Sequence, residues 1–174
     1  VRKIKFTKDD KTDSLIYDFS FNRIKKLDNI DKLKNSIYIN LTNNIIRDYA
    51  PLNSLKNLRV LHLRNNIIKS LKDFESFDNL IALDVGKNMI TDLTEINPQK
   101  ELKFLELDTM TSLISTKGID KFPGLIGLSI DDCDSLEYLH DIDKLKKLEY
   151  LYVSDSKNFR DYEKGLLGLD NLKE

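Results

Sequence analysis

The chain has 174 residues, 40% of them hydrophobic and 33% charged, with 28 Lys and Arg against 29 Asp and Glu. This length fits one domain with a sizeable core. The near-zero net charge of −1 argues against a general nucleic-acid or membrane-surface binder, because such proteins need a basic excess. No run of about 18 apolar residues occurs, so we expect no membrane insertion.

The first segment, residues 1–13, is charged throughout and lacks the apolar core of a signal peptide. Within it, Ile4-Lys5-Phe6 is a candidate strand that would cover the first unit of the following domain. We therefore predict an N-terminal cap over 1–13 and the main domain over 14–174. Cys133 is the only cysteine, which excludes an internal disulfide and favours a reducing compartment. A cytoplasmic location is thus favoured over a secreted or cell-surface one, although a leader removed earlier would leave the same sequence.

From residue 14 onward the sequence repeats one frame, Leu-x-x-Leu-x-Leu-x-x-Asn, followed by apolar residues at every third position. The clearest copy runs from Leu58 through Asn66 to Phe77. The units, numbered 1 to 7 below, begin at residues 14, 36, 58, 80, 102, 125 and 148. This number is well above the roughly three units that a stable stack of repeats needs.

Each unit is predicted to form one coil of a solenoid. The Leu-x-Leu stretch alternates with period two, which predicts a short strand with both leucines facing inward. The apolar residues at every third position suit 3₁₀-like turns. An asparagine just past the strand, at Asn22, Asn44, Asn66 and Asn88, is expected to hydrogen-bond the backbone of adjacent coils. Stacked coils would then share one continuous core.

The later units depart from this frame. Met110, Cys133 and Ser156 replace the asparagine, and the spacing between units grows beyond 22 residues after position 102. Cys133 in this slot is predicted to be a buried, inert small hydrophobe. Residues 109–124 form the most irregular connection, which we interpret as decay of the repeat rather than as a functional insertion.

This frame resembles the leucine-rich repeats of the 22-residue class, found in bacterial internalins and in a group of eukaryotic phosphatase regulators. Residues 46–58 (IRDYAPLNSLKNL) are similar to the convex segment of internalins, and the family frame covers about residues 14–172. The resemblance implies an α/β repeat solenoid, a horseshoe with a parallel concave β-sheet and short 3₁₀ or irregular convex segments. It also implies a binding scaffold, either an adhesin for a host protein or an intracellular regulator.

No constellation of residues predicts catalysis. The sequence lacks a P-loop, a glycine-rich nucleotide turn and zinc-like Cys/His spacing. His62 is predicted on an outward strand face and His140 in a convex turn, so no nucleophile–base pair can form. We therefore predict no enzyme, no catalytic residue, no cofactor and no metal site, with calcium between paired carboxylates as a lesser alternative.

The outward side chains of the strands, at positions 3, 5, 7 and 8 of each unit, should form columns about 4.8 Å apart on the concave face. From unit 4 onward these columns hold six acids against one base, Lys87. Neighbouring acids repel, so packing alone gives no reason for these pairs. Three aromatic residues accompany the acids. The predicted partner-binding residues are Asp84, Phe104, Glu106, Asp108, Asp131, Asp132, Tyr150, Tyr152 and Asp155.

Acids beside aromatic anchors suit a basic protein partner. We predict a monomeric, non-catalytic protein–protein interaction module that uses the concave face of units 4–7. The alternatives are a secreted internalin-like adhesin, a structural spacer within a larger protein, and a solvated acidic surface that binds nothing. Neutralising Glu106 and Asp108 is expected to weaken binding and to leave stability unchanged or raised.

Overall fold

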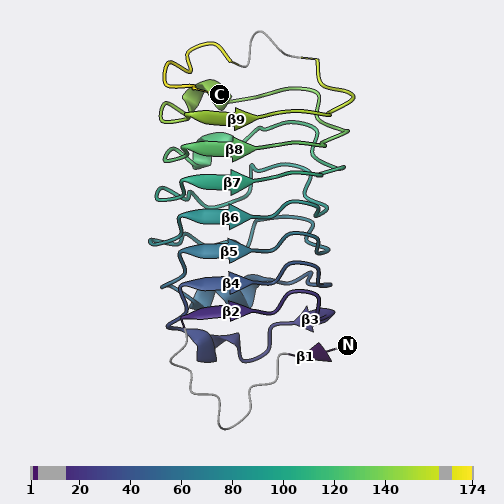
Figure 1. Cartoon of the computed structure of the whole chain (residues 1–174), viewed down its shortest axis with the longest axis vertical. Coiled ribbons are helices and arrows are strands. Elements are labelled where there is room, and N and C mark those ends of the chain that lie inside the picture. Colours follow the sequence, from purple (N-terminus) through teal and green to yellow (C-terminus); the bar gives the residue numbers. More distant parts are fainter. Residues whose placement is uncertain (1, 4–14, 161–165, 174) are drawn as a thin grey trace.

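The computed structural model of the chain describes residues 2–3, 15–160 and 166–173. The described chain winds into coils that stack along one long axis (Figure 1). The predicted repeat solenoid with a parallel sheet is confirmed. The helical segments of the described residues are all short 3₁₀ turns, and none of them is long and apolar enough to cross a membrane.

One strand from each unit builds the main sheet. Its seven strands lie in chain order and pair in parallel. They are β2 (Ile16–Asp18), β4 (Tyr38–Asn40), β5 (Val60–His62), β6 (Ala82–Asp84), β7 (Phe104–Glu106), β8 (Gly127–Ser129) and β9 (Tyr150–Tyr152). Each strand occupies positions 3 to 5 of its unit, and equivalent positions pair across every neighbouring pair of strands. The predicted outward columns therefore run straight along the sheet.

A second, two-stranded sheet joins the start of the chain to unit 1. Its strands are β1 (Arg2–Lys3) and β3 (Ile24–Lys26), and they pair in parallel. The predicted capping strand Ile4–Phe6 lies outside the described residues.

The convex side is formed by turns and four 3₁₀ segments. These are η1 (Ile30–Leu33), η2 (Ala50–Ser54), η3 (Ile119–Lys121) and η4 (Ile142–Lys144). Pro51 lies in the first turn of η2, where a missing N–H costs nothing because it would have no helical partner. The apolar residues at every third position point into the core from these turns, with Phe74, Phe77 and Phe122 among the largest buried side chains.

The predicted asparagine ladder is confirmed in units 2 to 4. Asn66 shows the pattern: its Oδ1 accepts a hydrogen bond from the N–H of Ile46 at 2.9 Å. Its Nδ2 donates to the carbonyls of Leu41 and Leu63 at 3.0 and 2.9 Å. Asn44 and Asn88 make the same contacts one coil away. Each amide thus satisfies buried backbone groups of its own coil and of the preceding one.

The slots without asparagine are filled differently. Met110 and Cys133 are fully buried, as predicted for the cysteine. The Cys133 thiol lies 3.3 Å from the Leu107 carbonyl, and its backbone N–H donates to Ser156 Oγ at 3.1 Å. Burial raises the pKa of the Cys133 thiol to about 11, so the reactive thiolate is scarce at neutral pH. In the irregular segment, buried Thr116 donates through Oγ1 to the His140 carbonyl at 2.6 Å, which ties this segment to the next coil.

Candidate partner-binding site

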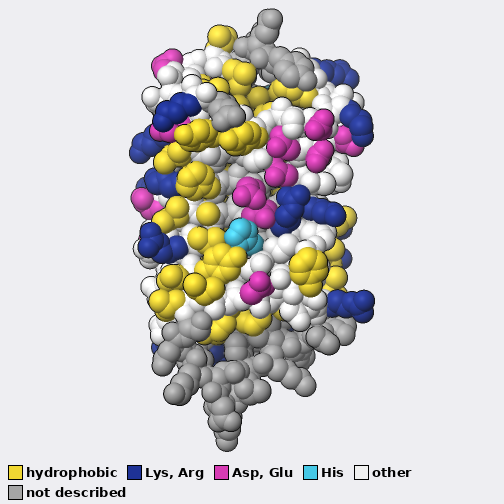
Figure 2. Space-filling view, viewed as in Figure 1, with side chains coloured by type: hydrophobic (Ala, Val, Ile, Leu, Met, Phe, Trp, Pro, Cys, Tyr) yellow, Lys and Arg dark blue, Asp and Glu magenta, His cyan; other side chains and the backbone are white. Residues whose placement is uncertain are grey.

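The concave face is divided along the direction of its strands. Figure 2 shows apolar side chains gathered near the strand starts and acidic side chains gathered near the strand ends, over β6 to β9. The nine predicted binding residues all belong to units 4 to 7, which contain these four strands. Their surroundings separate them into four groups with different roles.

Asp84 is predicted to face outward toward a partner, and this prediction is wrong because the residue is buried. It is only 5% exposed. Its Oδ1 accepts a hydrogen bond from the Gly86 N–H at 2.9 Å, and its Oδ2 lies 3.6 Å from Nδ1 of His62. This carboxylate raises the pKa of His62 above the usual value. Asp84 is therefore committed to contacts within the sheet.

Asp84 exemplifies a local cap that recurs in the early units. The residue at position 5 accepts a hydrogen bond from the N–H at position 7, where the strand ends and the chain turns. Asp18 does so for Ser20 at 2.8 Å, and Asn40 does so for Thr42 at 3.0 Å. This is the turn that Asp and Asn side chains form with the backbone two residues ahead.

Asp108 and Asp131 also cap the N–H at position 7, but they do so from position 7 of the preceding unit. Asp108 Oδ1 accepts from the N–H of Asp131 at 3.0 Å and from Ser129 Oγ at 2.7 Å. Asp131 Oδ1 accepts from the N–H and hydroxyl of Ser154 at 2.7 and 2.8 Å. Each aspartate thus caps position 7 of the following unit. The premise that packing gives no reason for this acidic pair is wrong, since each carboxylate stabilises backbone.

Asp132 and Asp155 lie at position 8, where the backbone is left-handed in every unit. The φ angles are positive at all seven equivalent residues, namely Phe21, Asn43, Asn65, Lys87, Thr109, Asp132 and Asp155. Asn and Asp tolerate this region better than other non-glycine residues. Backbone conformation therefore accounts for the choice of aspartate at Asp132 and Asp155, although both side chains remain exposed.

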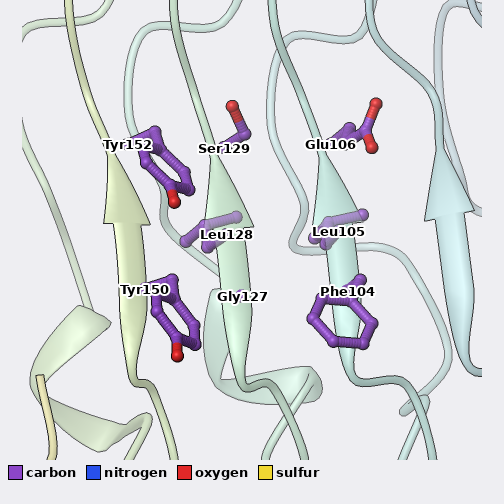
Figure 3. A pocket seen from close by; sticks show the side chains of 8 residues that line it. All are labelled: Phe104, Leu105, Glu106, Gly127, Leu128, Ser129, Tyr150 and Tyr152. Carbon is purple, nitrogen blue, oxygen red and sulfur yellow. The ribbon is translucent and has the colours of Figure 1, made fainter. Parts of the chain in front are cut away.

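The fourth group surrounds a pocket over β7 to β9 (Figure 3). We call it the aromatic pocket; its volume is about 290 Å³. Its lining residues are Phe104, Leu105, Glu106, Gly127, Leu128, Ser129, Tyr150 and Tyr152. The rings of Phe104, Tyr150 and Tyr152 stand over the sheet on either side of β8, and Glu106 stands at the end of β7. Four of the nine predicted residues thus come together here.

Gly127 shapes this pocket. A Cβ atom at this position would lie only 2.9 Å from Cδ1 of Phe104, so the glycine lets the Phe104 ring lean over β8. Phe104 and Tyr152 remain 47% and 44% exposed. Sequence reasoning missed Gly127 and Ser129 as site residues. The available signal was a glycine in a column of otherwise mostly large apolar side chains.

Glu106 differs from the other acids of the sheet. Within the described part of the chain, its carboxylate makes no hydrogen bond or ion pair, whereas Asp84 faces His62 and Asp108 faces Arg64. Partial burial, together with the carboxylates of Asp84 and Asp108, raises the pKa of Glu106. Glu106 is a charge placed where the fold alone disfavours it.

A cation of the chain itself already lies against one wall of the pocket. Nζ of Lys173 is 5.9 Å from the centroid of the Tyr150 ring and forms a 2.6 Å ion pair with Glu149. This is cation–π geometry. Among the described residues, no group of three or more His, Cys, Asp or Glu side chains is arranged to hold a metal ion.

Comparison with known proteins agrees with this architecture. A family model described as "Leucine Rich repeats (2 copies)" matches residues 37–78 and 56–98. No curated protein sequence matches the chain significantly. The repeat frame, the seven-stranded parallel sheet and this match define the class: the chain has the leucine-rich repeat fold, and the family model covers its residues 37–98.

Solved structures show the same fold. The chain is similar to internalin C2 from Listeria monocytogenes strain 4b F2365, with a TM-score of 0.65 and 19% identity over 92% of this chain and 79% of that one. It is also similar to the leucine-rich repeat domain of APL1B, with a TM-score of 0.64 and 21% identity. That match covers 81% of this chain and 41% of the other. At this identity the likeness concerns the fold.

Proposed function

We propose that this chain is a monomeric, non-catalytic protein-interaction module that binds a basic protein partner on the concave face of units 4 to 7. The observation that supports this most directly is Glu106, a carboxylate without an ion pair among the described residues, which lines the same pocket as the half-exposed Phe104 and Tyr152. Exposed aromatic anchors next to an unneutralised acid are typical of surfaces that bind positively charged partners.

The acids that serve this function are fewer than the sequence predicts. Asp84, Asp108 and Asp131 are occupied by backbone and side-chain contacts. Glu106 and the exposed Asp132 and Asp155 remain available to a partner. They supply attraction and orientation, whereas the aromatic pocket supplies the contact area.

The proposal is tested by selecting peptides from a random phage-displayed library on the purified protein. We expect enriched peptides to carry excess Lys and Arg and to lose binding to a variant with Glu106→Gln, Asp132→Asn and Asp155→Asn. Asparagine keeps the left-handed backbone at the last two sites. The matched control neutralises three exposed convex acids, Asp31, Asp73 and Asp143, and should keep full binding.

Two results would contradict the proposal. Enriched peptides without a basic excess would show that charge does not guide recognition. Equal losses in the concave and convex variants would show that only net charge matters. A selection that enriches no peptide would favour the alternative of a structural spacer. In the alternative of a secreted internalin-like adhesin, the partner would be a host protein. The same variants would test whether it binds this surface.

A further inference from the structure

We propose that the aromatic pocket holds a single arginine side chain of the partner, with its guanidinium group against Phe104 and Tyr152 and paired with Glu106. This inference rests on the proposed function and names the group that the concave face recognises. It is carried by the size of the pocket, its walls, and the distribution of charge around it.

The size of the pocket limits its occupant. Its volume of about 290 Å³ is just below the range of roughly 300–1,000 Å³ in which small-molecule sites usually fall. The pocket is also open along the sheet surface, between three rings that rise from β7 and β9 (Figure 3). Such a site takes one side chain delivered by a partner rather than a cofactor.

The walls of the pocket favour a flat cation. Three of its side chains are aromatic, and Gly127 has no side chain of its own, which leaves room for the Phe104 ring beside β8. A guanidinium group is planar and weakly hydrated, and it stacks on aromatic rings; an ammonium group is compact and strongly hydrated. The ammonium of Lys173 near Tyr150 shows that one of these rings already lies beside a positive charge.

The charges around the pocket leave one position open. Nδ1 of His62 lies 3.6 Å from Asp84, and Nη1 of Arg64 lies 3.8 Å from Asp108, so both basic side chains already face an acid. Glu106 stands between Asp84 and Ser129 in the position-5 column. His62 and Arg64 are near enough to lower its pKa, but among the described residues neither forms an ion pair with it. A carboxylate can accept two parallel hydrogen bonds from a guanidinium group, which supplies the missing contact.

The test is a titration of the ¹⁵N-labelled protein, followed by NMR, with an acetylated and amidated peptide Gly-Gly-Ser-Arg-Ser-Gly-Gly. We expect saturable shifts centred on the backbone amides of Gly127 and Ser129. The same peptide with citrulline, which is neutral and nearly isosteric, should bind at least about fivefold more weakly. The lysine peptide should fall between the two.

Two variants locate the binding. Glu106→Gln and Tyr152→Leu should each weaken arginine binding by at least about fivefold, because they remove the charge and one aromatic face. Asp73→Asn, at an exposed acid of the convex side, is the matched control and should change the affinity by less than about twofold, since it removes an equal charge outside the concave face. Thermal unfolding of each variant confirms that the fold is retained.

The outcomes separate this inference from the proposed function. If citrulline or lysine binds as tightly as arginine, or if Glu106→Gln has no effect, the pocket is not an arginine site. Shifts centred on Asp132 and Asp155 instead would overturn the inference and leave the concave face as a basic-partner surface. No saturable shift with any cationic peptide would count against both.

Discussion

Units 1 to 4 and units 5 to 7 use different side chains to hydrogen-bond their backbone. In units 2 to 4 an asparagine at position 9 bonds two coils, and Asp or Asn at position 5 caps the strand end in units 1, 2 and 4. In the later units Met110, Cys133 and Ser156 occupy position 9. Position 7 of units 6 and 7 is capped by an aspartate of the preceding unit.

This difference explains where the pocket lies. A position-5 residue that must cap its own strand end has to be Asp or Asn. Once Asp131 caps the N–H of Ser154, position 5 of unit 7 is released, and Tyr152 occupies it. One wall of the aromatic pocket, Tyr152, therefore lies where the cap comes from the preceding unit.

The largest expected effect concerns the asparagine ladder. Asn66→Ala removes a hydrogen bond to Ile46 and two to buried carbonyls, so we expect a loss of about 3 kcal/mol in the free energy of unfolding. Ser156→Ala removes the bond that Ser156 Oγ accepts from the Cys133 N–H and a longer one that it donates to the Ser154 carbonyl, and should cost about 1 kcal/mol. Urea denaturation followed by circular dichroism measures both, and equal losses would show that the two halves do not differ in this respect.

The next largest effect is expected at Asp131, which caps the N–H of Ser154 in the following unit. Asp131→Ala removes two hydrogen bonds to Ser154, and we expect a loss of about 1–2 kcal/mol in unfolding free energy. Adding Tyr152→Asn should recover part of this loss, because asparagine at position 5 can cap its own strand end as Asn40 does. If the double variant is no more stable than the sum of the single changes, the two caps are not interchangeable.

A smaller effect is expected at position 8 of unit 5. Thr109 is β-branched and has a φ of 60°, a conformation that costs such residues roughly 1 kcal/mol or more. Thr109→Asn should raise the midpoint of thermal unfolding, partly offset by loss of the 3.1 Å bond from Arg64 Nη2 to Thr109 Oγ1. The reverse substitution at the equivalent position of unit 3, Asn65→Thr, should lower the midpoint of thermal unfolding. A lower midpoint for Thr109→Asn would mean that the bond to Arg64 outweighs the backbone cost.

The smallest effect on stability is expected for Glu106→Gln. Because the pKa of Glu106 is raised in the folded state, its charge destabilises the fold at pH 7, and this cost fades as the pH falls through the folded pKa. The variant should therefore be as stable as the wild type or more stable at pH 7, with the difference vanishing in acid. Urea denaturation at pH 7 and pH 4 measures this, and a clear loss of stability at pH 7 would show that Glu106 supports the fold.

The frame of the repeat predicts most of the fold, because Leu61 and Leu63 recur with equivalents in each coil and can be buried only by stacking. It also predicts Phe104, Glu106, Tyr150 and Tyr152 as neighbours on one face. It does not predict that Asp84 is buried or that Asp108 caps the next unit. Those facts depend on side-chain direction at the strand ends, which the spacing of residues leaves open. The expectation of unchanged stability on neutralisation therefore holds for Glu106 as a prediction, whereas for Asp108 we now expect a loss.

Some acids of the exposed columns, such as Asp108, stabilise the backbone, whereas others, such as Glu106, are proposed to bind the partner. This division is tested most directly by the dissociation constant of the arginine peptide for two variants of one unit, Glu106→Gln and Asp108→Asn, at physiological salt. We predict at least about fivefold weaker binding for the first and less than about twofold for the second, since Asp108 is turned toward the next coil. Equal weakening by both, or a larger effect of Asp108→Asn, would contradict this division.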